Sequence, residues 1–220
     1  PFLHADADPY PVAVEGKIVW VVDLYTTTSR YPYAQETETD QLSEASGLRH
    51  DFNYVRNSVK ATVDAYDGTV TLYVTDADDP IVNAYQKAFP DLFTPGDEMS
   101  PALREHVRYP EDLFRVQTTA YARYHLTDPD NFYTQEDAWR VARDPGTAGA
   151  DPSTPVTDTA GQATGEQTSP RSNPYYQLLQ LPNTNGEAEA PPGEPEMVLM
   201  RPFVPQSDDD RSQLLTAFMA

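Results

Sequence analysis

The sequence opens with one imidazole and two carboxylates at alternate positions: His4, Asp6 and Asp8. In an extended strand these side chains share one face, because successive side chains point to opposite sides. Divalent cations accept imidazole nitrogen and carboxylate oxygen, but a complete site needs further ligands from elsewhere. The pattern therefore predicts either a cation site at His4, Asp6 and Asp8 or a polar strand edge.

A second polar segment runs from Asp23 to Tyr33 and combines hydroxyls, phenols and one guanidinium. Such a set suits a sugar or a polar polymer, because aromatic rings stack on the ligand and hydroxyls hydrogen-bond to it. The alternative is the exit of a strand, with tyrosines packed over a small core. The candidate ligand-binding residues are Asp23, Tyr25, Thr26, Thr27, Arg30, Tyr31 and Tyr33.

A third acidic group, Asp76-Ala77-Asp78-Asp79, precedes Pro80. A calcium loop of the EF-hand type needs acids at alternate positions, a central glycine and a distal glutamate, and the spacing here fails that pattern. Asp79 before Pro80 instead indicates the start of a helix.

Motifs for nucleophilic, phosphate-binding or zinc-dependent catalysis are missing: there is no GxSxG, Walker loop or HExxH. With 35 acidic residues, two neighbouring carboxylates are expected by chance and carry little weight. The sequence therefore assigns no catalytic residues and no cofactor, and it favours a non-catalytic protein.

The charge balance limits the partners. The chain has 15 basic and 35 acidic residues, a formal net charge of −20. Nucleic-acid binding is excluded, because that affinity comes from basic side chains that displace counterions from phosphates. Anionic lipid surfaces are disfavoured for the same reason. The absence of cysteine excludes disulfides and thiolate zinc sites.

Hydrophobic periodicity predicts β-hairpins at both ends. Residues 12–23 flank a Glu-Gly turn, and residues 55–75 alternate around Asp67-Gly68, typical of a strand pair with one dry face. Residues 175–181 and 197–204 predict two further strands, joined by a long loop over 182–196.

Helices are expected between these hairpins, over roughly residues 79–141. Their start signals are Asp79-Pro80, Ser100-Pro101 and Pro110-Glu111-Asp112, and Thr134-x-x-Asp137 resembles a capping box before Trp139. We therefore expect an α+β fold with antiparallel hairpins at both ends and a helical insertion in the middle. The expected organisation is an α+β part over 1–143, a flexible linker over 144–173, and a C-terminal hairpin over 174–220 that packs back on the same domain.

Several segments together resemble a conserved, uncharacterised integral membrane protein family of actinobacteria and cyanobacteria. The resemblance covers essentially the whole chain except the linker. It is carried by Asp8–Val12, Gly16–Trp20, Asp23–Thr28, Tyr31–Tyr33, Asn53–Lys60, Val63–Gly68, Arg108–Phe114 and Tyr121–His125.

This resemblance implies a parent protein with several N-terminal transmembrane helices and a large extracytoplasmic C-terminal region. The present chain, which starts at Pro1 without a methionine, is then expected to be a water-soluble section of that region at the cell membrane. The implied partners are its own transmembrane region, the remaining ectodomain, and an envelope component or another protein.

We therefore expect a non-catalytic extracytoplasmic domain that serves envelope interaction, assembly or regulation. Two alternatives stay open. One is an envelope-glycan hydrolase or transferase, with Asp23, Asp64 and Arg30 clustered near one groove. The other is a divalent-cation-binding module at His4, Asp6 and Asp8.

Overall fold

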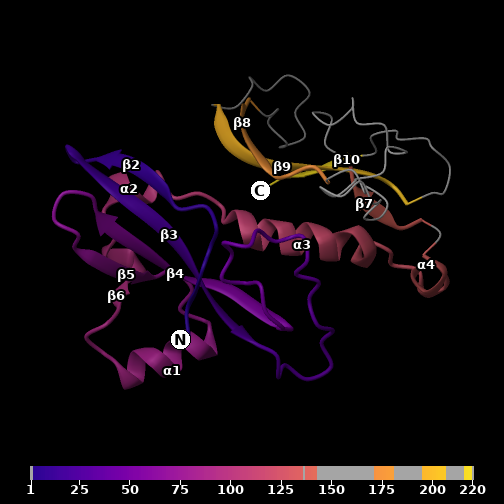
Figure 1. Cartoon of the computed structure of the whole chain (residues 1–220), viewed down its shortest axis with the longest axis horizontal. Helices are drawn as coiled ribbons and strands as arrows, with labels where there is room; N and C mark the ends of the chain where they lie inside the picture. The colour runs from indigo at the N-terminus through magenta and orange to yellow at the C-terminus, as the bar shows by residue number, and fades with distance from the viewer. Residues whose placement is uncertain (1, 136, 143–170, 181–194, 207–215, 220) are drawn as a thin grey trace, which may run out of the picture. The chain divides into compact units, whose positions relative to one another are not determined.

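The chain folds into two β-sheets and several helices, an α+β architecture, as predicted (Figure 1). Figure 1 shows a computed structural model, which describes residues 2–135, 137–142, 171–180, 195–206 and 216–219. The chain divides into two compact units, Pro1–Gln117 and Thr118–Ala220. The predicted linker over 144–173 and the loop over 182–196 lie mostly outside the described residues.

The first unit is built on a sheet with the strand order β1-β3-β4-β5-β6, in which β2 also pairs with β3. All pairs are antiparallel except β5 with β6. The strands are β1 His4–Ala5, β2 Tyr10–Val14, β3 Lys17–Thr28, β4 Tyr54–Asp64, β5 Val70–Val74 and β6 Thr94–Pro95.

Both predicted N-terminal hairpins are present. Glu15 and Gly16 join β2 to β3 with φ angles of 53° and 75°, as expected for a two-residue turn in which both residues have positive φ. The second turn is longer than the predicted Asp67-Gly68 pair, because the hairpin closes where Thr69 O accepts from Asp64 N. The Asp64 carboxylate accepts from Tyr66 N (2.8 Å), a side-chain turn that favours the longer loop.

Three helices begin where the sequence signals predict. Asp79 caps α1, Ser100 caps α2, and α3 follows Pro110. The helical segments of this part of the chain are α1 Pro80–Ala88, the 3₁₀ helix η1 Gly96–Glu98, α2 Pro101–Arg104 and α3 Glu111–Tyr124.

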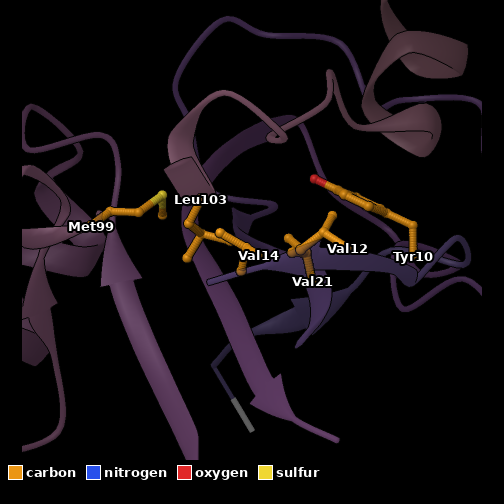
Figure 2. Packing of buried hydrophobic residues seen from close by; sticks show 6 residues of the cluster. All are labelled: Tyr10, Val12, Val14, Val21, Met99 and Leu103. Carbon is orange, nitrogen blue, oxygen red and sulfur yellow. The ribbon is translucent and has the colours of Figure 1, made fainter. Parts of the chain in front are cut away.

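Helical segments pack against both faces of this sheet. On one face, Met99 and Leu103 pack with Tyr10, Val12, Val14 and Val21, the cluster that Figure 2 shows. On the other, Val82 of α1 and Phe93 pack with Val59 and Val74. The prediction of a single dry face on β4 is therefore wrong: its even-numbered residues Ser58, Lys60 and Thr62 are also buried.

The second unit contains a sheet with the order β10-β9-β7, in which β8 also pairs with β9. The two predicted C-terminal strands are confirmed as β8 and β9. The predicted capping box at Thr134 is wrong: helix α4 ends there, Gln135 adopts a left-handed conformation, and Trp139 starts a strand. The elements are α4 Pro129–Thr134, β7 Trp139–Val141, β8 Tyr175–Leu179, β9 Glu196–Pro205 and β10 Thr216–Met219.

Candidate functional site

A group of buried charges lies in the first unit and includes an ion pair between β3 and β4. The register places Asp23 directly opposite Lys60. Lys60 Nζ donates to the Asp23 carboxylate and to Arg108 O (3.3 Å), and the two side chains are only 7% and 3% exposed. Burial raises the pKa of Asp23 above its ordinary value, although the Lys60 ammonium opposes that shift.

The network continues to Asp6 through Tyr25. A bulge interrupts the β3–β4 register between Leu24 and Thr26, at the position of Tyr25. The Tyr25 hydroxyl donates to the Asp6 carboxylate, and Asp6 N donates to Asp23 O (2.9 Å). Burial, followed by the Asp6 charge, raises the pKa of Tyr25, so the phenol stays protonated.

Asp6 and Tyr25 also cap helix α3. The first four amides of a helix lack partners within the helix, and Pro110, which precedes α3, has no side-chain acceptor. Asp112 N instead donates to Asp6 Oδ2 (3.0 Å) and Leu113 N to Tyr25 Oη (3.3 Å). The Asp6 carboxylate therefore sits at the positive end of the helix dipole.

Asp112 in turn accepts a hydrogen bond from the chain segment that carries Asp6. Its Oδ2 accepts from Ala7 N (3.0 Å), so the segment after β1 and the first turn of α3 bind each other reciprocally. Burial and the neighbouring Asp6 carboxylate both raise the pKa of Asp112. This network joins the segment after β1 to β3, β4 and α3, and its groups contact one another.

A further buried carboxylate, Asp79, is the centre of a separate hydrogen-bond network. It accepts from Thr26 Oγ1 and Ser58 Oγ, from Tyr54 Oη (2.9 Å) and from Ile81 N (2.9 Å). Burial acts to raise the pKa of Asp79, but these donors, Ser58 and Thr26 first, outweigh it and hold the pKa below its ordinary value.

The structure separates the three residues of the predicted cation site. The His4 ring lies 4.3 Å from the His50 ring, whereas Asp6 belongs to the buried network. The strand ends at Ala5, and Asp8 N donates to Asp6 Oδ1 (2.8 Å), so the chain turns and the period of two is lost. Within the described parts of the chain, no three His, Asp or Glu side chains are placed to hold a metal ion.

The predicted ligand-binding segment is divided between interior and surface. Asp23, Tyr25 and Thr26 are buried in the hydrogen bonds described above. Thr27 is half-buried, with its Oγ1 3.0 Å from His50 Nε2. The remaining three predicted residues are exposed: Arg30, Tyr31, which stacks on Tyr54, and Tyr33.

The acids expected near one groove are also apart. Asp64 faces Val19 in the register, four positions along β4 from Lys60, and pairs with Lys17 (2.9 Å). Arg30 lies beyond the end of β3 and is exposed. The structure therefore does not gather Asp23, Asp64 and Arg30.

Sequence reasoning missed Lys60, Ser58 and Asp112. Lys60 and Ser58 stand at the positions of β4 that were expected to face water, and Asp112 looked like an ordinary acid in a first helical turn. The usable signal was a lysine between Val59 and Ala61 in a strand, which becomes meaningful once Asp23 is known to lie opposite.

The first unit also has a surface hollow of about 580 Å³ between β5, α1 and α2. Its charged lining residues are Asp97 and Arg104, and the Arg104 guanidinium donates to the backbone oxygens of Gly96 (3.0 Å) and Asp97 (3.2 Å). None of the buried carboxylates of the network lines it.

The lowered pKa of Asp79 predicts a specific pH dependence. A carboxyl group whose native pKa lies below its unfolded value of 3.8 stabilises the fold above that value, and the stabilisation is lost as the pH falls through the native pKa. The advantage of the wild type over Asp79→Asn should therefore be complete near neutral pH and shrink in acid. Urea unfolding from neutral pH to below the ordinary pKa measures it, with exposed Asp97→Asn as the control. An advantage that grows in acid would contradict the assignment.

Comparison with known proteins finds relatives that are much longer than this chain. The model of a family described as "Uncharacterised protein family (UPF0182)" matches residues 1–220. A UPF0182 protein of Frankia alni is 40% identical over 230 residues, covering 100% of this chain and 19% of that protein. A UPF0182 protein of Methanospirillum hungatei is 41% identical, covering 94% of this chain and 20% of that protein. One of Arthrobacter sp. is 42% identical, covering 94% of this chain and 19% of that protein.

The chain thus spans about a fifth of the length of these curated relatives. No solved structure matches it. Among the helices that the structure describes, none combines the length and the apolar character that crossing a membrane requires.

Proposed function

The chain belongs to the uncharacterised protein family UPF0182, and from that premise we propose that it is a non-catalytic, extracytoplasmic module of a multi-pass membrane protein. Its role would be structural: to hold the remaining ectodomain and the transmembrane region in place, or to contact an envelope component. Residues 1–220 cover about a fifth of the curated relatives, which supports a module of a longer protein. The membrane-anchored parent is what the resemblance of the sequence implies.

The non-catalytic part of the proposal is supported by one observation: the buried carboxylates already bind partners within the protein. Catalytic acids and bases need access to a substrate, in a cleft where their pKa values are tuned to the reaction. Here Asp23 binds Lys60, Asp6 binds Tyr25 and the first turn of α3, and Asp79 accepts four hydrogen bonds. A network of this kind fixes elements to one another.

We do not propose the glycan hydrolase. It required Asp23, Asp64 and Arg30 near one groove, and these residues lie in different surroundings.

The location can be tested with one engineered thiol. The chain has no cysteine, and Lys87 is exposed in the last turn of α1. In the full-length protein, freed of any other cysteine, Lys87→Cys should react with a membrane-impermeant maleimide in intact cells. Reaction only after the cells are permeabilised would overturn the extracytoplasmic placement.

A further inference from the structure

One end of the first sheet presents apolar side chains to solvent. Directly paired residues in an antiparallel sheet share a face, and so do residues two apart along a strand. The register pairs Ala13 with Ile18 in one row, and Pro11, Trp20, Val63 and Val70 in the next. We call six residues the open face: the exposed Pro11, Ala13, Ile18, Trp20 and Val70, and the half-buried Val63.

The same face is covered at its other end. In the next row Val22 pairs with Ala61, and Ala61 with Leu72; here Ala61 is only 5% exposed. One row further, Val59 and Val74 are packed under Val82 of α1. Beyond α1 the exposure rises steeply, to 57% for Ile18, 42% for Trp20 and 59% for Val70.

This composition is unusual for a solvated surface. An antiparallel sheet that faces water on one side normally carries polar residues there, and a single exposed apolar residue needs no explanation. A contiguous set in register is different, because large exposed apolar patches mark interaction surfaces. The reverse face at the same strand positions is covered, since Val14 and Val21 pack with Met99 and Leu103 (Figure 2).

We propose that in the full-length protein the open face packs against an apolar segment of the same polypeptide that lies outside residues 1–220. The curated relatives are about five times as long as the part that this chain matches, so such a segment is available in the same molecule. The proposal rests on the proposed function only in taking the chain as a section of a longer protein.

Charge argues against the other occupants. Two copies of a chain with a net charge of −20 repel each other, and an anionic bilayer surface repels each copy. A segment of the same polypeptide gains from tethering, because its effective concentration near the face is high. Its flanks should be neutral or basic to suit the acidic surroundings.

Thiol protection in the purified full-length protein tests the covered face. Ile18→Cys and Val70→Cys place thiols on two different strands of the open face, and Lys87→Cys supplies the exposed reference on α1. For each variant, the maleimide reaction rate in the native protein is divided by the rate in urea, which removes intrinsic differences between the thiols. We expect protection at positions 18 and 70 to exceed that at position 87 by about tenfold or more. Equal ratios of native to urea rates at the three positions would overturn the proposal.

A photo-crosslinker at position 18 identifies the occupant. The expected product is an intramolecular crosslink to a residue outside 1–220. Crosslinks confined to residues 1–220, crosslinks between isotopically distinct copies, or protection that appears only when lipid vesicles are added would each overturn it. The outcome is independent of the cell-surface labelling at Lys87, because purified protein shows protection whichever side of the membrane the module occupies.

Discussion

Replacing Lys60 by methionine should lower the free energy of unfolding by about 3–5 kcal/mol, because it leaves Asp23 as an unpaired charge in the interior. The Asp23 carboxylate is 3% exposed, and Lys60 is its ion-pair partner. The same substitution removes the hydrogen bond from Lys60 to Arg108 O (3.3 Å). Urea unfolding followed by circular dichroism measures the loss.

The pH dependence of this variant has a definite sign. Burial already raises the pKa of Asp23, and removing the Lys60 ammonium raises it further. A native pKa above the unfolded one means that the native state takes up the proton first, so the fold is favoured as the pH falls. The destabilisation of Lys60→Met should therefore be largest near neutral pH and shrink in acid.

Two controls separate charge from packing. Lys17→Met breaks the ion pair with Asp64 on the same two strands, but Lys17 is 61% exposed, so stability should change little. The double variant Asp23→Leu/Lys60→Met replaces the buried pair by apolar side chains of similar size and should regain most of the loss. A double variant that is no more stable than Lys60→Met alone would show that the loss does not come from an unpaired charge on Asp23.

Much of the fold follows from local signals. The Glu15-Gly16 turn, the Asp79 and Ser100 caps and the alternation in β4 identify their elements because each depends on neighbours in sequence. The errors have the same explanation. Thr134 resembled a cap, but it ends α4, and a strand follows at Trp139 because Trp139 pairs with Pro205 of β9, far away along the chain.

The candidate site was less accessible to sequence reasoning. Its residues come from the segment after β1 and from β3, β4 and α3. Asp6 and Asp112, which are in contact, lie 106 residues apart along the chain. The register of β3 against β4 is not set by a short turn, because residues 29–53 separate the two strands. Sequence therefore singled out Asp6, Asp23 and Tyr25 individually, but it could not show that they bind one another and the start of α3.

The second large effect is expected at Asp79, where helix capping and a buried hydrogen-bond network coincide. Asp79→Ala removes the cap of α1 and leaves the hydroxyls of Thr26 and Ser58 without their acceptor in the interior. Loss of a cap costs about 1 kcal/mol, and leaving buried donors unsatisfied adds about 1–3 kcal/mol, so we expect a total near 2–4 kcal/mol.

Ser100→Ala is the matched control for this variant, because Ser100 caps α2 through Leu103 N (3.3 Å). It should cost only about 1 kcal/mol, the usual effect of a lost cap. Asp79→Asn should fall between the two, since the amide oxygen can still accept from Ile81 N but the second oxygen, which accepts from Thr26 and Ser58, is replaced by a donor. If urea unfolding gave Asp79→Ala and Ser100→Ala the same loss, the hydroxyl network around Asp79 would contribute nothing beyond the cap.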